Sequence, residues 1–232
     1  MVSWLVGSVL GMAQAQPTFA EVEKNKYEAL TKLTSFSGTY NIVVVPNEGA
    51  GVKQVLNLLF TPAGRSAKIV VNGLPQMDMA WTAKERWIIL YGERRYNLQT
   101  ASDSFPLTNP YAPLPVEDGS ANLSIEISGI RFGAKPEPKV IEVKTEDVEG
   151  KSLRKITSKG TNPQSGGEIT FAQWFDGQGW LLRKFELELK GADGKKTTIK
   201  GELVNDSDKP NAGESAFKLP ETVRNSFTRI TG

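Results

Sequence analysis

The hydrophobic pattern of residues 166–204 predicts three consecutive β-strands joined by two tight turns. In the middle strand apolar and charged positions alternate, which is the period of two that a half-buried strand shows. One face carries Leu181, Arg183, Phe185, Leu187 and Leu189, and the other carries Leu182, Lys184, Glu186, Glu188 and Lys190. The turns at Asp176–Gly179 and Asp193–Gly194 supply residues that tolerate positive φ angles in hairpins. This β-meander therefore has one core face and one solvent face.

The same alternation continues before the midpoint of the chain. Residues 36–44 alternate up to Pro46, and further strands are expected at 52–61, 65–72, 76–82, 86–91 and 94–99. A later hairpin is predicted from 139–148 and 152–159 across Glu149–Gly150, and residues 215–220 predict a short edge strand closed by Pro220. Because short turns separate these segments, they favour an antiparallel sheet in sequential order.

One helix is expected, over residues 18–33. Thr18 and Glu21 have the spacing of a capping box. Apolar residues recur at helical spacing at Phe19, Val22, Ala29, Leu30 and Leu33. The sheet is the partner available for this stripe, so the pattern predicts a mostly β (α+β) fold with one long N-terminal helix.

Several strands carry apolar residues on both faces, as at 55–60 and 87–91. Such strands either pack between the helix and another layer or line a ligand cavity with one face, and the sequence leaves both interpretations open. Met77, Met79 and Trp81 alternate with Asp78 and Ala80, so two thioethers and an indole share a face. Methionine adapts to irregular apolar partners, although it also fills ordinary cores.

The midpoint interrupts the strands. Residues 105–118 contain four prolines, which exclude a regular helix or a central strand. The stretch is too apolar for a solvated tether, so we interpret it as a loop across the open face of the sheet, a candidate lid. Residues 121–132 fit either a strand or a short helix.

Composition excludes much of catalysis. The chain has no histidine and no cysteine, which removes the commonest zinc ligands, histidine-based triads, cysteine nucleophiles and disulfides. Glu186 and Glu188 lie among lysines, where cross-strand charge pairing is ordinary. We expect no catalytic residues, no metal site, no cofactor and no enzymatic activity. The 28 basic and 26 acidic residues are well mixed, so nucleic acid is not an expected partner.

The N-terminus is typical of a signal peptide at residues 1–15, because a short apolar run ends in Ala13-Gln14-Ala15. The run is shorter than the roughly 20 apolar residues that span a bilayer. The remaining residues, 16–232, are expected to form a single domain. That domain is predicted to be a monomer in the periplasm or outside the cell.

In its order of elements the chain resembles the outer-membrane lipoprotein-sorting family of periplasmic carriers, the LolA-like proteins. The resemblance is carried by an apparent signal, a helix that leads into "LTSFSGTYNIVV", the strand pair "AKERWIILYGERRYNLQ", the late "FAQWFDGQGWLLRKFELELKGADGKKTTIKGEL" and the terminal "SAFKLPETV". It covers roughly residues 18–224. The proline-rich midpoint departs from the family pattern, which has lid helices there, and the lid-locking arginine of the family is not assigned to Arg65, Arg94, Arg95 or Arg131.

The resemblance implies an antiparallel, incomplete β-barrel that holds lipoprotein acyl chains or other lipids under helix and loops. The implied function is a periplasmic carrier, with membrane-bound donor and acceptor proteins as further partners. The alternative is a regulatory sensor of the same fold that binds a lipidated or misfolded ligand and signals to a membrane protein. Alternation in the strands gives the candidate lipid-binding residues: Leu56, Leu58, Phe60, Met77, Met79, Trp81, Trp87, Ile89, Phe171, Phe185, Leu187 and Leu189.

Overall fold

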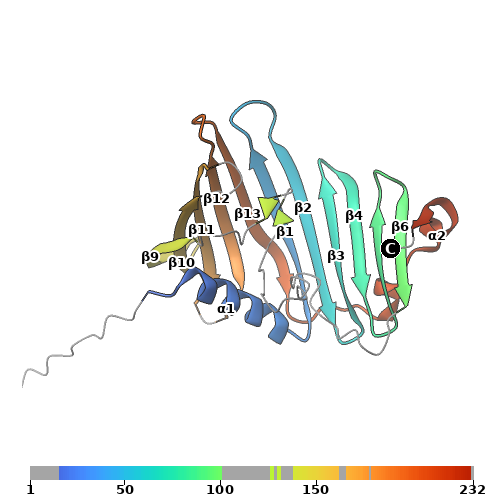
Figure 1. Ribbon diagram of the computed structural model, residues 1–232. Coiled ribbons are helices and arrows are strands. Elements are labelled where there is room, and N and C mark those ends of the chain that lie inside the picture. Colours follow the sequence, from blue (N-terminus) through green and yellow to red (C-terminus); the bar gives the residue numbers. More distant parts are fainter. Residues whose placement is uncertain are drawn as a thin grey trace, which may run out of the picture.

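The computed structural model describes residues 16–100, 126–127, 130–131, 138–161, 166–177 and 179–230 (Figure 1). The N-terminal part contains α1 (Phe19–Lys32), β1 (Phe36–Val45), β2 (Val52–Thr61), β3 (Gly64–Val71), β4 (Leu74–Trp81), β5 (Glu85–Leu90) and β6 (Arg95–Thr100). The later part contains β7 (Glu126–Ile127), β8 (Ile130–Arg131), β9 (Lys139–Val148), β10 (Lys151–Thr161), β11 (Glu168–Asp176), β12 (Leu182–Lys190), β13 (Lys196–Ser207), a 3₁₀ turn η1 (Glu214–Phe217), α2 (Glu221–Ser226) and β14 (Thr228–Ile230). The expected strands between residues 52 and 99 are confirmed to within two residues at each end.

One 12-stranded sheet organises the molecule, in the order β14-β6-β5-β4-β3-β2-β1-β13-β12-β11-β10-β9. Two runs of strands, β1–β6 and β9–β13, each follow the order of the chain. Neighbouring strands within each run are antiparallel, as the short turns predicted. The two runs join where β1 pairs with β13, so that Tyr40 lies opposite Leu203. The fold is therefore mostly β and built on one large open sheet, consistent with a half-barrel.

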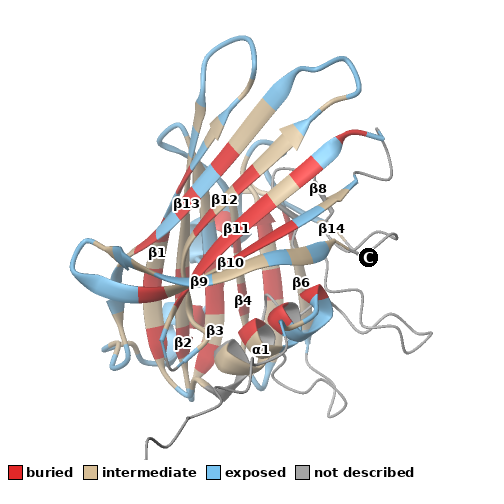
Figure 2. Cartoon of the chain, turned by 90° about the vertical axis from the view of Figure 1, so that its left-hand side faces the viewer, coloured by how far each residue is buried: buried red, intermediate tan, exposed pale blue. Residues whose placement is uncertain are grey.

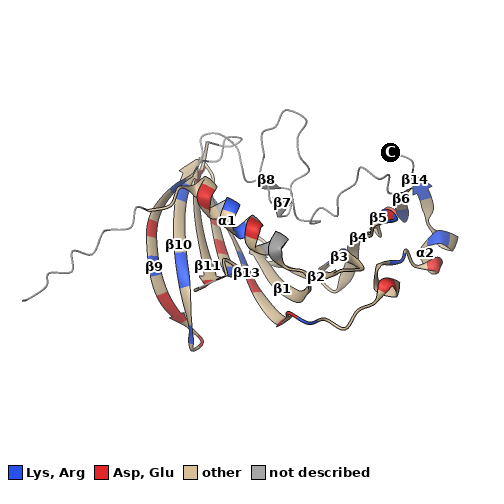
Figure 3. Ribbon diagram, turned by 90° about the horizontal axis from the view of Figure 1, so that it is seen from below, with Lys and Arg blue, Asp and Glu red and all other residues tan. Residues whose placement is uncertain are grey.

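The sheet has two faces of different character. The inner face carries Tyr40, Leu58 and Phe185, and α1 packs on it (Figure 3). The outer face carries Trp87 and Trp174 and contacts the C-terminal segment over β4–β6. Figure 2 shows long buried stretches on β10 and β11, where residues 156–158 and 171–175 are buried in succession because both faces of these strands are covered.

Helix α1 begins as the capping box predicted. The backbone N–H of Thr18 donates to Glu21 Oε2 at 2.7 Å, and the N–H of Glu21 donates to Thr18 Oγ1 at 3.2 Å. Phe19 and Val22 are buried against the sheet. At 14 residues the helix is short, so the expectation of a long N-terminal helix is wrong in length.

The C-terminal segment differs from its prediction. Residues 215–220 form no edge strand: Glu214–Phe217 is a 3₁₀ turn, and Phe217 and Leu219 are buried on the outer face beside Trp87. Alternating apolar residues occur in both conformations when the segment is this short. The edge strand lies further along, where β14 pairs in parallel with β6.

The middle strand of the meander also departs from strict alternation. A β-bulge at Arg183 lets Trp174 pair with Lys184 and Phe175 pair with Leu182. Leu182 therefore packs with Phe175 on the inner face, and the prediction that it lies on the charged face is wrong. In the described part of the preceding turn, Trp180 rather than a glycine has a left-handed backbone, with φ 53°.

Within residues 121–132 the structure describes the pair β7–β8, which confirms the strand interpretation for those four residues. The expected signal peptide at 1–15 and the candidate lid at 105–118 lie outside the described residues.

Candidate functional site

Three rows of side chains cross the inner face between β1 and β6, because directly paired residues share a face. The first row is Phe36, Phe60, Arg65, Trp81, Arg86 and Gln99. The second is Gly38, Leu58, Ala67, Met79, Ile88 and Asn97, and the third is Tyr40, Leu56, Ile69, Met77, Leu90 and Arg95. Successive rows are about 7 Å apart, since two residues of a strand rise by that distance.

The second and third rows form an apolar wall over β2–β5. At its β1–β2 side Leu58 is buried in a cluster that includes Phe19 of α1. Ile69, Met77, Ile88 and Leu90 are half-buried. Among the residues that the structure describes, these four join none of the four buried clusters. The fold therefore presents apolar side chains here without packing them into the core.

Ten of the twelve candidate lipid-binding residues lie on the inner face. Six of them occupy the three rows on β2–β4: Leu56, Leu58, Phe60, Met77, Met79 and Trp81. Four lie on β11 and β12: Phe171, Phe185, Leu187 and Leu189. Leu58, Phe60, Phe171, Phe185 and Leu187 are buried in the same cluster, so these five are core residues in this structure.

Trp87 and Ile89 do not share that face. They pair with Ala80 and Asp78 on the outer face, where Trp87 is 5% exposed and Ile89 fully buried. Trp87 Nε1 donates to the carbonyl oxygen of Phe217 at 2.7 Å. Their placement with the inner-face residues is wrong, because β5 is apolar on both sides and alternation alone does not say which set faces inward.

The inner-face residues of β5 are Arg86, Ile88 and Leu90, and sequence reasoning missed them together with Arg65 and Ile69. The signal that identifies them is the pairing of Met77 with Leu90 and of Met79 with Ile88. That register depends on the β4–β5 turn, where Thr82 Oγ1 accepts from the N–H of Glu85 at 3.0 Å.

A polar group beneath α1 was also missed. Lys26 is 4% exposed, and its Nζ lies 6.0 Å from the centre of the Phe171 ring. Ser158 and Gln173 on neighbouring strands are fully buried on the same face. Lysine at this helical position belongs to the buried stripe, since it lies four residues after Val22.

The outer face holds the strongly perturbed carboxylate. Trp174 Nε1 donates to Glu146 Oε2 at 2.8 Å, and Lys144 and Lys155 lie 3.0 and 3.3 Å from Glu146 Oε1. The hydrogen bond from Trp174, followed by the two lysines, lowers the pKa of Glu146 to about 2. Glu146 is thus a structural carboxylate held by cations. Glu186 is held in the same way, because its Oε1 lies 3.1 Å from Lys200 Nζ.

Two tyrosines are held neutral. Burial raises the pKa of Tyr40, whose hydroxyl donates to the carbonyl of Leu182 at 2.6 Å on the inner face. Burial, with the negative charge of Asp78, raises the pKa of Tyr91 to about 12. Neither group is poised to exchange a proton near neutral pH.

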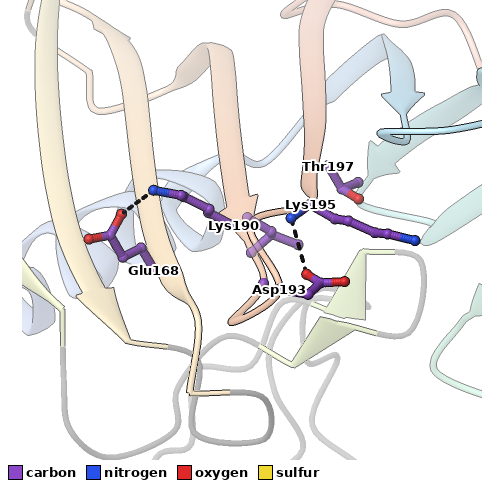
Figure 4. Close-up of a pocket in the computed structure, with 7 residues that line it drawn as sticks. Glu168, Lys190, Asp193, Lys195 and Thr197 are labelled. Carbon is purple, nitrogen blue, oxygen red and sulfur yellow. Dashed lines mark hydrogen bonds and ion pairs between the residues drawn. The ribbon is translucent and has the colours of Figure 1, made fainter.

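A small polar hollow of about 240 Å³ lies at the β12–β13 hairpin (Figure 4). Its charged groups have partners in the protein: Lys190 Nζ is 3.8 Å from Glu168 Oε2, Asp193 Oδ1 accepts from the backbone N–H of Lys195 at 3.0 Å, and Lys195 Nζ is 3.5 Å from Glu48 Oε1. A wider groove of about 830 Å³ runs along the C-terminal segment and the β4–β5 turn. Neither hollow is lined by Met77, Met79 or Leu56.

Within the described ranges there is no group of three or more metal-ligating side chains. In the same part of the chain, no helix combines the length and the apolar character that crossing a membrane requires.

These features define a protein with an open curved sheet whose inner face carries an apolar wall. No family model and no curated protein matches the sequence. Among solved structures, the chain is similar to an uncharacterized conserved protein from Thermus thermophilus, at 12% identity and a TM-score of 0.47, over 91% of this chain and 97% of that one.

The chain is also similar to a LolA superfamily protein from Nitrosomonas europaea, at 10% identity and a TM-score of 0.33, over 88% of this chain and 99% of that one. A third similar structure is the lipoprotein LppX of Mycobacterium tuberculosis, at 12% identity and a TM-score of 0.39, over 83% of this chain and 96% of that one.

Proposed function

We propose that this protein binds lipid acyl chains on the apolar wall of β2–β5 and carries them, as an exported protein, between membranes of the cell envelope. The observation that carries the proposal is the set of half-buried residues Ile69, Met77, Ile88 and Leu90. They share one face of the sheet and join no buried cluster within the described part of the chain.

The energetics favour an acyl chain as the occupant. Each methylene group removed from water contributes about 0.8 kcal/mol, so a chain laid across several strands gains binding energy without a specific polar contact. Two thioethers on the wall, Met77 and Met79, adapt to chains of different shape. The inner face of β2–β6 carries no aspartate or glutamate, since Asp78 and Glu85 lie on the outer face and Glu93 lies in the β5–β6 turn.

Binding is tested with a fluorescent fatty acid and by native mass spectrometry of protein purified from the periplasm. The variant Met77→Glu places a carboxylate on the half-buried wall, where an apolar chain would desolvate it. We expect the affinity to fall at least about tenfold. The matched control is Val43→Glu, because Val43 is 37% exposed on the outer face, and there we expect wild-type binding.

Both variants must unfold cooperatively like the wild type for the comparison to count. Equal binding by Met77→Glu and wild type would place the ligand elsewhere, and absence of any bound or added lipid would overturn the proposal.

A carrier and a sensor differ in what they do with the bound lipid. A carrier transfers a fluorescent fatty acid from donor to acceptor vesicles at a rate proportional to protein concentration. If the protein binds the fatty acid but does not speed transfer, and instead co-purifies with one membrane protein in a ligand-dependent manner, it is a sensor. Cell fractionation, with the mature N-terminus read by mass spectrometry, tests export and cleavage after Ala15.

A further inference from the structure

Strand β9 forms a long edge of the sheet. In the described part of the chain it pairs with β10 on one side and with no strand on the other, so it lies at the end of the sheet (Figure 1). It has ten residues, whereas β14 at the other end has three. An edge strand presents backbone N–H and C=O groups with which a further strand can pair. Ile141 is 47% exposed here, which leaves an apolar side chain of this edge open to solvent.

The charges of β9 alternate in sign along its outer face. Lys144 Nζ lies 3.2 Å from Glu142 Oε1 and 3.0 Å from Glu146 Oε1 on that face. Val143 lies between them on the inner face, where it is half-buried beside Ile156. From residue 142 to residue 148 the pairing with β10 is regular, because the β-bulge of this ladder comes before residue 142. The middle of the edge is therefore a straight strand with a charged side and an apolar side.

A second copy of β9 complements this pattern when the two strands pair antiparallel around Val143. Val143 then lies opposite Val143 of the second copy, and Glu142 of each copy lies opposite Lys144 of the other. Opposite charges directly across a ladder stabilise the pairing, and like charges weaken it. A register centred on Lys144 would instead set Lys144 against Lys144 and Glu142 against Glu146. Charged edges discourage pairing with unrelated strands, but a second copy supplies the matching charge at both positions.

We propose that two copies of this protein associate through their β9 edges, with Val143 at the two-fold axis, in place of the monomer that the sequence predicts. Residues directly opposite one another share a face, so the inner faces of the two sheets lie on the same side of the dimer. One strand from each copy makes an interface smaller than the roughly 1,200 Å² of a stable complex. The dimer is therefore weak and forms as the protein concentration rises.

Sedimentation equilibrium between about 1 μM and 1 mM protein measures the association. Wild type is expected to pass from monomer to dimer within this range. The variants Lys144→Glu and Glu142→Lys each turn two attractive pairs into two repulsive ones, so each should weaken the dimer at least about tenfold. An equimolar mixture of the two variants opposes a glutamate to a lysine at every such position. We expect the mixture to form a heterodimer about as well as wild type forms the homodimer.

The matched control is Lys200→Glu. Lys200 is also an outer-face lysine with a carboxylate partner, since its Nζ lies 3.1 Å from Glu186 Oε1, but it belongs to β13 in the interior of the sheet. This variant loses an ion pair of the same kind away from the edge and should associate like wild type. Thermal unfolding shows that each variant is folded at the temperature of the measurement.

A single introduced thiol reports the register, because the chain has no cysteine. In Val143→Cys the two substituted positions face each other with Cα atoms about 4.5–5.5 Å apart, so a short bifunctional thiol reagent should link the two copies. In Thr145→Cys the two positions are four residues apart along the ladder, about 13 Å, and the same reagent should leave the copies unlinked.

The inference is overturned if wild type stays monomeric at about 1 mM, if Lys144→Glu associates as well as wild type, or if the mixed variants do not associate. Linking through Thr145→Cys but not through Val143→Cys would overturn the register. Each of these outcomes leaves the proposed function standing, because none of the substitutions lies on the apolar wall. Should Val143→Cys fail to fold, the charge-reversal variants and their mixture decide.

Discussion

At the residue scale, close packing on the inner face depends on a glycine. Gly201 of β13 pairs with Phe185 of β12, and a Cβ built on Gly201 would lie 2.1 Å from Cε1 of that ring. Phe185 is buried in the main cluster. We expect Gly201→Ala to destabilise the protein by about 1–3 kcal/mol, since the ring must leave its position. Urea unfolding measures the change.

Gly92→Ala is the control, because nothing lies within 4 Å of its Cβ position. Adding Phe185→Leu to Gly201→Ala should recover part of the loss. If Gly201→Ala proves as stable as Gly92→Ala, the ring does not lie over the glycine.

The carboxylate of Glu146 predicts a pH dependence on the outer face. Its pKa in the folded protein is about 2, below the usual 4.5, because Trp174, Lys144 and Lys155 stabilise the charged form. The stabilisation is therefore complete above about pH 4.5 and is lost as the pH falls through about 2. Glu146→Gln should be less stable than wild type at pH 6, with the difference shrinking between pH 4.5 and 2.

Thermal unfolding at several pH values measures that difference. Glu149→Gln is a suitable control, since Glu149 is an exposed residue of the β9–β10 turn. A difference between Glu146→Gln and wild type that stayed constant down to pH 2 would contradict the assignment.

At the element scale, the C-terminal segment binds the outer face through Trp87. The indole N–H is a buried donor to the Phe217 carbonyl, so Trp87→Phe leaves that oxygen without its partner. We expect a loss of about 1–3 kcal/mol in the free energy of unfolding. Trp81→Phe is the matched control, because Trp81 is half-buried on the inner face and belongs to no buried cluster within the described residues.

Chemical denaturation followed by far-UV circular dichroism compares the two variants without relying on tryptophan fluorescence. Equal stabilities would show that the hydrogen bond to Phe217 contributes nothing measurable.

Elements were predictable from the sequence wherever turn or capping residues mark their ends. Short turns separate the strands from Val52 to Thr100, and the capping box of Thr18 and Glu21 fixes the start of α1. The face of a strand was not predictable when both sides are apolar, as for Trp87 and Ile89, because only its register with β4 decides between them. The site was predictable in part for the same reason: Met77 and Met79 follow from alternation, whereas Arg65 and Arg86 become neighbours of Trp81 only through pairing.

At the scale of the whole molecule, each run of strands is covered in part by a segment that belongs to the other run. Val22 of α1, from the N-terminal run, packs on Ile156 and Phe175 of β10 and β11. Phe217 and Leu219, which follow the later run, pack on Trp87 of β5. Each run therefore exposes an apolar face when the other is missing, and the β1–β13 ladder that joins them pairs residues such as Tyr40 and Leu203 from opposite ends of the chain.

This mutual covering predicts that neither run folds alone. Fragments 16–100 and 138–232, produced separately, should lack cooperative unfolding and should bind a dye that reports exposed apolar surface, because each leaves buried clusters without their partners. Co-expressed, they should associate through the β1–β13 ladder and recover a cooperative transition. Tyr40→Glu, which places a charge in the buried part of that ladder, should prevent the association, whereas Val43→Glu on its exposed side should permit it. Cooperative unfolding of either fragment by itself would show that one run is a self-sufficient domain to which the other is merely added.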